Sequence, residues 1–375
     1  MPALNGNNNW GRFRITNFDH MFDLHSVKKP KTSPERKTSV TSPVQLILLD
    51  WASLIEVKCP AQGLSSEVFF VKLRNGKELV LKFPFNESAI EVERVASEFI
   101  GRNTDTLRTP HTRVITPEGH EVDIIKKTVA KLGGEDAESL RNRMSRHSGP
   151  IICMEKMEGQ TLDFYGADKK LLKDPRFVRR LGEITAFDIL LGNIDRLLTL
   201  NPDNILFDHK KGTFHLIDQK VSMYELSGMI PGHNLDTDVF SDENAGYSLQ
   251  LEVMLEVNDR LKHYLGPMIT SFRKGDFGGS ALSERVGFMF EIEHQMHIDR
   301  VVFDKGLYEG FLKIARNFGM AGVEAADQWK GAGAEGAGLF HNWLTVSNLL
   351  PDAQKLLAEG ANSGRKKEGF FRKPW

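Results

Sequence analysis

Three polar residues in the middle of the chain have the types and positions that magnesium-dependent phosphoryl transfer requires. In the stretch GNIDRLLTLNPDNILFD, Asp195 follows an apolar helical segment and Asn204 directly precedes an apolar run. A second carboxylate, Asp218, follows the next apolar run, FHLI. Carboxylate and amide oxygens suit magnesium, and a further carboxylate can orient an attacking hydroxyl. Asn204 or Asp218 alone is equally explained as a turn or strand-end residue, but their joint order favours chemistry.

A lysine and a glutamate upstream could complete such a site. In the segment ELVLKF, alternation places Lys82 and Val80 on one face of an expected strand. Glu93 lies on a mostly apolar side of the helix expected next, where an unpaired carboxylate would be costly. A Lys82–Glu93 ion pair would remove that cost. Glu91 is the alternative partner, on a side of the helix that is more solvated.

The link CPAQGLSSE between the first two expected strands carries Gly63, Ser65 and Ser66. Small residues let backbone N–H groups approach an anion, so a hairpin that covers phosphates is one interpretation. Many ordinary turns share this composition, and the link alone does not decide between the two.

The elements that must position these residues form a sheet-rich first third and a helix-rich remainder. Asn75-Gly76 predicts a tight hairpin, because this dipeptide readily adopts positive φ angles. A polar stretch over 117–147 has room for one short helix. The pattern therefore favours an α+β chain with two lobes. Strands are expected at 53–59, 67–73, 78–83, 111–116, 150–159 and around 205 and 216. Helices are expected at 87–101 and 176–192, and helical patterns dominate after the strand near 216 to about 358.

Changes in composition divide the chain into four predicted segments. Residues 1–43 end in a stretch rich in Ser, Thr, Pro and Lys, which predicts a disordered leader. Residues 44–155 form the N-lobe and 156–358 the C-lobe. Residues 359–375 are expected to be a loose basic tail.

Composition and charge disfavour several classes of partner. A hydrophobic content of 40% and a charged content of 26% are typical of a soluble globular protein. The net charge of -1 supplies no global field for nucleic acid or an anionic membrane, so neither partner is expected. The two cysteines, Cys59 and Cys153, are far apart, which favours a reducing compartment. With no secretory h-region near the start, the cytoplasm is the expected location.

The segments FDILLGNIDR, NPDNILF and LIDQ resemble loops of atypical members of the protein-kinase-like superfamily. The chain from about 45 to 345 resembles the catalytic domain of the actin-fragmin kinase family. The resemblance implies a bilobal protein-kinase-like fold, with an antiparallel-sheet N-lobe, one embedded helix and a helix-rich C-lobe. It also implies ATP and Mg²⁺ as cofactors and phosphorylation of threonine on actin in an actin-capping, fragmin-like complex. A location at the actin cytoskeleton would follow.

Carried over by residue, the resemblance implies that Lys82 contacts phosphate, that Glu93 anchors it, and that Asp195 is the catalytic base. Asn204 and Asp218 would bind magnesium. The segment IICMEKMEG resembles a kinase hinge, with Met154 behind adenine and residues 155 to 157 in backbone contact with it; an apolar core strand followed by a polar loop is the alternative. The expected nucleotide contacts are Gly63, Ser65, Ser66, Val68, Val80, Lys82, Glu93, Met154, Glu155, Met157, Leu206 and Ile217.

The chain departs from the usual kinase pattern at several points. Asp195 and Asn204 are nine residues apart where the template has five, and the His commonly found near the catalytic Asp is missing from 193–197. Asp-Phe-Gly is replaced by Asp218-Gln219-Lys220, and no Ala-Pro-Glu occurs in 221–250. These changes put ordinary activation-loop control in doubt. The kelch repeats of that family are also not visible.

Other functions compete with a protein Ser/Thr kinase. A lipid or small-molecule kinase would use the same residues, and a pseudokinase would keep the cleft only as a scaffold. The segment EIEHQMH offers His294 and His297 for a metal hydrolase, although a solvated helix face explains it better. The motif GAGAEGAG at 331–338 follows a helical pattern where a dinucleotide loop needs a strand, so it is interpreted as a flexible connection.

Overall fold

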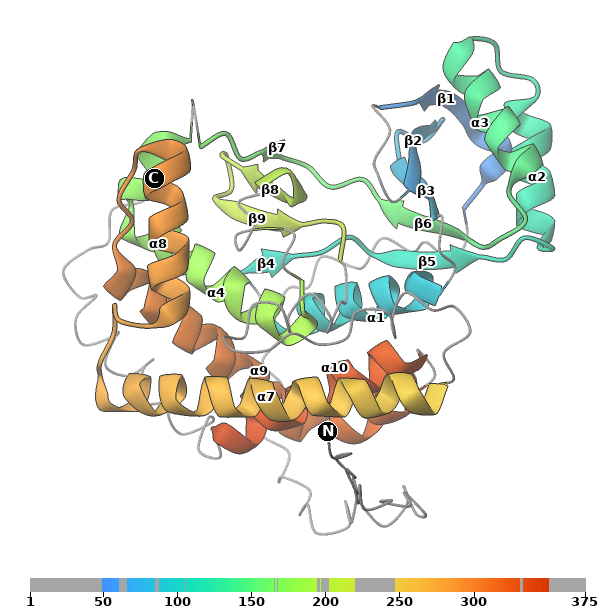
Figure 1. Ribbon diagram of the computed structural model, residues 1–375. Coiled ribbons are helices and arrows are strands. Elements are labelled where there is room, and N and C mark those ends of the chain that lie inside the picture. Colours follow the sequence, from blue (N-terminus) through green and yellow to red (C-terminus); the bar gives the residue numbers. More distant parts are fainter. Residues whose placement is uncertain are drawn as a thin grey trace, which may run out of the picture. The chain divides into compact units, whose positions relative to one another are not determined.

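The computed structural model describes residues 49–350, with several gaps. The predicted leader and basic tail lie outside the described residues. The structure confirms the expected α+β class, with antiparallel strands in the first part of the chain and helices in the last (Figure 1). The gaps are 61–65, 85–87, 105, 165, 167, 194–195, 197–201, 220–246 and 331–332.

The first sheet has five strands in the order β1-β2-β3-β6-β5, and each neighbouring pair is antiparallel. A short 3-10 turn, Trp51–Ser53, leads into it. The bounds follow the predicted strands closely. They are β1 Leu54–Lys58, β2 Ser66–Leu73, β3 Glu78–Pro84, β5 Thr112–Ile115 and β6 Ile151–Glu155.

The β2–β3 hairpin turns at the predicted dipeptide. Gly76 has a φ of 85°, and its N–H donates to the carbonyl of Leu73 at 2.9 Å. The Leu73 N–H donates in turn to the carbonyl of Lys77 at 2.9 Å. This turn sets the register that pairs Val68 with Lys82 across the two strands.

The side chains on the two faces of β3 are buried in different clusters, as the alternation of the strand predicts. Leu79, Leu81 and Phe83 enter a large apolar cluster, while Val80 belongs to a smaller cluster on the other face. Lys82 shares the Val80 face and is itself buried. The strand therefore places a charged side chain on the same buried face as the apolar Val80 cluster.

The first sheet is accompanied by three helices, not the single embedded helix of the prediction. Helix α1, Ser88–Asn103, corresponds to the expected one. Helices α2, His120–Val129, and α3, Glu135–Arg146, lie next to β1 (Figure 1). Helix α3 was not predicted because its apolar periodicity is weak. Its buried side chains are those of Ala137, Leu140 and Met144.

A second sheet has the order β4-β9-β8-β7. Strands β8, Ile205–Asp208, and β9, Thr213–Leu216, form the predicted antiparallel pair. The two-residue strands β4, Leu107–Arg108, and β7, Gln160–Thr161, were not predicted. Because β4 pairs in parallel with β9, the chain leaves α1, joins the second sheet and then returns to the first at β5.

Helices dominate the rest of the described chain. Helix α4 begins with an Asp174 cap that accepts from the Arg176 N–H and ends at left-handed Gly192. In the part of the chain that the structure describes, no helix has the length and apolar character that crossing a bilayer requires. The remaining bounds are α4 Pro175–Leu191, α7 Tyr247–Lys274, α8 Ala281–His294, α9 Arg300–Lys330 and α10 Gly333–Leu349, with 3-10 turns at Lys169–Lys173 and Pro202–Asn204.

The interpretation of 331–338 as a flexible connection is wrong from residue 333 onward. Helix α10 starts at Gly333 and packs against α7 and α9 (Figure 1). Glycine lowers helix propensity only modestly, and burial of residues such as Leu339 and Trp343 outweighs that cost.

Helices α4 and α9 approach each other at backbone distance because glycines face the contact. A Cβ added to Gly182 on α4 would overlap the carbonyl oxygen of Phe303. One added to Gly306 on α9 would overlap the carbonyl oxygen of Arg179. This packing fixes α4, the helix that leads into the polar loop of the candidate site.

We predict that Gly306→Ala lowers the free energy of unfolding by about 1–3 kcal/mol, because the helices must move apart. Gly287→Ala on α8 is the matched control, since its added methyl would meet only the side chain of Arg300, at 3.2 Å. The control should be neutral or stabilising by about 1 kcal/mol. Urea denaturation measures both, and equal stability of the two variants would contradict the packing argument.

Candidate active site

The centre of the site is one buried ammonium group held between two carboxylates. The Nζ of Lys82 lies 2.7 Å from Glu93 Oε2 and 2.6 Å from Asp218 Oδ1. The predicted Lys82–Glu93 pair is therefore present, and Asp218 joins it. The side chain of the alternative partner, Glu91, lies outside the described residues. Lys82 and Glu93 are 10% exposed and Asp218 is 28% exposed, so the cluster opens on the Asp218 side.

The cluster has one more negative than positive group, and the pKa values reflect this. Burial alone would lower the pKa of Lys82, but Glu93 and Asp218 outweigh it and raise that pKa above its ordinary value. Burial also raises the pKa of Glu93, and the nearby Asp218 adds to that rise while Lys82 and Arg196 oppose it. Lys82 thus stays charged at neutral pH, and the excess negative charge favours a bound cation.

The β8–β9 hairpin brings two predicted magnesium ligands to one end of the second sheet. The Asn204 carbonyl, just before β8, accepts from the Ile217 N–H, just after β9, at 3.1 Å. Asp218 follows with a φ of 54°, a left-handed conformation that is uncommon outside glycine. Such a conformation persists only where surrounding contacts hold it.

Three of the predicted nucleotide contacts gather on the Lys82 face of the first sheet. Val80 and Met154 are buried together, and Val68 packs against them. This apolar cluster also contains residues that the sequence reading did not select. They are Phe70, Ile90, Val114 and Ile152. Leu206 and Ile217 are half-buried in the β8–β9 hairpin.

The end of β6 and the residues after it connect the first sheet to β7 of the second sheet. The Glu155 N–H donates to the carbonyl of His111 at 3.0 Å, and the Lys156 N–H donates to the carbonyl of Glu78 at 3.3 Å. These two N–H groups are therefore engaged within the protein. Residues 155–157 were predicted to contact adenine through their backbone. Among their N–H groups, that of Met157 takes part in no described hydrogen bond.

Four predicted residues lie wholly or partly outside the described part of the chain. Asp195, Gly63 and Ser65 lie outside the described residues, and of Ser66 only the backbone, at the start of β2, is described. The residues beside Asp195 are described: Asn193 and Arg196 are both fully buried.

Arg196 and Gln219 are site residues that the sequence reading missed. The guanidinium of Arg196 donates to the buried Asp188 carboxylate on α4, to the Ile217 carbonyl at 3.0 Å and to the Gln219 side chain at 2.6 Å. Gln219 takes the place of the usual Phe, and its amide donates to the Leu216 carbonyl at 2.8 Å. Arg196 and Gln219 are 23 residues apart, and no periodicity in the sequence links them. Only the tertiary structure could reveal this pair.

A second buried carboxylate, Glu183 on α4, ties the chain after α1 to the large helices. It accepts from Thr104 at 3.1 Å and from Thr106 at 2.9 Å, and pairs with Arg180 and Lys313. Burial would raise the pKa of Glu183, but Lys313 and Arg180 hold it below its ordinary value. The network anchors the end of α1, the helix that presents Glu93.

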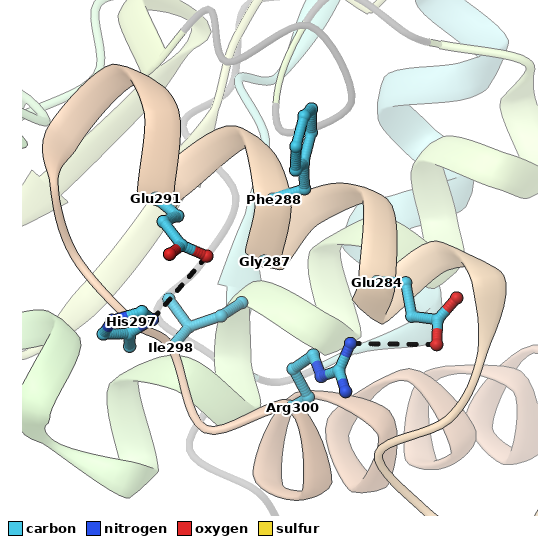
Figure 2. Close-up of a pocket in the computed structure, with 7 residues that line it drawn as sticks. All are labelled: Glu284, Gly287, Phe288, Glu291, His297, Ile298 and Arg300. Atoms are coloured by element: carbon cyan, nitrogen blue, oxygen red, sulfur yellow. Dashed lines mark ion pairs between the residues drawn. The ribbon is translucent and has the colours of Figure 1, made fainter.

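The alternative metal site on α8 has no support in the described residues. His297 is 84% exposed and lies 3.9 Å from Glu291 (Figure 2), and the side chain of His294 lies outside the described residues. The described part of the chain contains no cluster of three or more His, Cys, Asp or Glu side chains suited to a metal ion.

The family model described as the catalytic domain of actin-fragmin kinase matches residues 33–276, which is more than half of the 375-residue chain. A search of curated proteins found no match. The matched range contains every residue of the site described above except Lys313 on α9.

We predict that Lys82→Met lowers the free energy of unfolding by about 3–5 kcal/mol at pH 7, because it removes the ammonium group that neutralises the buried Glu93 and the partly exposed Asp218. The loss should shrink as the pH falls, because burial raises the pKa of Glu93 and its carboxyl then takes up a proton. In the wild type, the pKa of Lys82 is raised in the folded state. The stability that its charge contributes is therefore complete at pH values below the ordinary lysine pKa, and it is lost only as the pH rises through the folded-state pKa. Lys58→Met, at an exposed pair, is the control for denaturant titration; equal effects would contradict the prediction.

We predict that Glu183→Gln lowers the free energy of unfolding by about 2–4 kcal/mol at pH 7. Because the Glu183 pKa is depressed, its contribution is present above the ordinary glutamate pKa and is lost as pH falls through the folded-state value. The difference from wild type should therefore narrow in strong acid. Glu309→Gln, at an exposed pair with Arg179, is the control. A difference that does not change with pH would count against the charge network.

Proposed function

The chain belongs to the family of actin-fragmin kinase catalytic domains, and on that premise we propose that it transfers the γ-phosphoryl group of Mg-ATP to a Ser or Thr hydroxyl of a protein. Actin within a fragmin-like complex is the proposed substrate, and the cytoplasm and its actin cytoskeleton the proposed location. The observation that carries the proposal is the Lys82–Glu93–Asp218 cluster.

Lys82 is the group proposed to bind the phosphates of ATP. Its raised pKa keeps the ammonium charged, and its pairing with Glu93 fixes the side chain before nucleotide arrives. The apolar cluster around Val80 and Met154, on the same face of the sheet, is suited to the adenine ring. Adenine and phosphates would thus lie along one face of β2, β3 and β6.

Asp218 and Asn204 are the residues proposed to hold magnesium. Both lie at the same end of the β8–β9 hairpin, and the partly exposed Asp218 belongs to a cluster with excess negative charge. A single carboxylate with an amide fits Mg²⁺, which completes its shell with water and substrate phosphates and needs no protein cage. When bound, the ion would neutralise charge on the transferred phosphoryl group.

Asp195 is proposed to orient the attacking hydroxyl and accept its proton. Its side chain lies outside the described residues, so this role rests on the family and on chain position. The described residues nearest to it in the chain, Asn193 and Arg196, are fully buried.

The test is transfer of labelled γ-phosphate from Mg-ATP to purified actin–fragmin complex, followed by identification of the labelled amino acid. Asp195→Ala and Asp218→Asn should each lower the transfer rate at least about a hundredfold. His297→Ala, at an exposed position three residues beyond the end of α8, should leave the rate unchanged.

Other outcomes separate the competing functions. Labelling of a lipid or aminoglycoside panel without protein labelling would establish a small-molecule kinase and reject the protein substrate. Absence of magnesium-dependent nucleotide binding in the wild type would reject catalysis and favour a scaffold.

A further inference from the structure

We propose that Arg196 and Gln219 form a clamp that holds Asp218 in place as a metal ligand, so that Arg196 is a positioning residue for magnesium. The inference rests on the proposed function, because it concerns the magnesium that the function requires.

The clamp begins with a guanidinium that bridges three segments. Arg196 is fully buried and reaches Asp188 on α4, the Ile217 carbonyl and the Gln219 side chain. The Asp188 carboxylate is also fully buried, and it neutralises the charge that would otherwise be isolated in the interior. The charged pair therefore gives Arg196 a fixed position from which it holds the next segment.

Asp218 lies between the two residues that Arg196 holds. Before it, the Ile217 N–H donates to the Asn204 carbonyl and the Ile217 carbonyl accepts from Arg196. After it, the Gln219 side chain accepts from Arg196 and donates to the Leu216 carbonyl. Four hydrogen bonds thus restrain the backbone on both sides of the left-handed Asp218.

Gln219 is suited to this place by its chemistry. A side-chain amide supplies one acceptor and two donors, so it can serve Arg196 and the Leu216 carbonyl together. It is 2% exposed, so an apolar side chain there would leave Arg196 without one of its acceptors in the interior. The field of Arg196 also reaches the centre of the site, since it lowers the pKa of Glu93 against the effect of burial.

The consequence is that Asp218 faces Lys82 without help from a ligand. Its Oδ1 is 2.6 Å from Lys82 Nζ in the protein alone. A carboxylate held in one conformation binds a metal ion more tightly than one that must be ordered on binding. Loss of the clamp should therefore weaken magnesium binding more than nucleotide binding.

The experiment measures the affinity of Mg²⁺ for the full chain saturated with a non-hydrolysable ATP analogue, by calorimetry, and the affinity of the analogue without metal. Gln219→Leu should weaken Mg²⁺ binding about tenfold or more while metal-free analogue binding changes less than about twofold. Gln219→Glu, which still accepts from Arg196, should restore most of the affinity. In phosphate transfer, Gln219→Leu should need more Mg²⁺ for half-maximal rate and recover its rate at high Mg²⁺.

Arg196→Lys provides a second disruption that keeps the charge opposite Asp188, and it decides the question if Gln219→Leu does not fold. Arg113→Lys is the matched control, because Arg113 lies on β5 of the first sheet and pairs with Glu121 on α2. If Gln219→Leu, or a folded Arg196→Lys, binds Mg²⁺ with wild-type affinity, the clamp is overturned and the proposed function is not affected. A wild type that binds the analogue with no magnesium dependence overturns both the clamp and the proposed function.

Discussion

The structure depends on a single ammonium group that must stay charged in the interior. Lys82 can do so only because Glu93, 11 residues later, and Asp218, 136 residues later, are brought to it from different elements. A buried lysine without these partners would lose its proton or destabilise the fold. The hairpin register, the seating of α1 and the left-handed conformation at Asp218 are all conditions for this one contact.

The position of α1, which carries Glu93, depends on contacts with helices that come much later in the chain. Phe99 on α1 packs edge-on against Phe187 of α4, with ring centroids 6.3 Å apart, and against Trp343 of α10, at 5.0 Å. Thr104 and Thr106, just beyond α1, are held by Glu183. The helix that carries Glu93 is therefore anchored by side chains of α4 and α10, as well as by the strands that precede and follow it.

Local patterns predicted much of this arrangement. Asn75-Gly76 placed the hairpin, alternation in β3 assigned Lys82 to the correct face, and helical spacing located α4 to within a residue or two at each end. Strand β4 was missed because two residues carry no periodicity and its partner lies over a hundred residues away. The partners of Arg196 and Glu183 were missed for a related reason: buried polar pairs are created by packing, which sequence spacing does not encode.

The dense packing of α9 and α10 has a practical meaning for anyone who wishes to express the catalytic unit. The family signature ends at Asp276, just beyond α7. A recombinant fragment cut there would lack Phe303, Leu307 and Phe311, which are fully buried, and Trp343, which packs on α1. It would also lack Lys313, a counter-charge of Glu183. The packed core therefore extends past the matched family range, and a fragment should include the chain to at least residue 350.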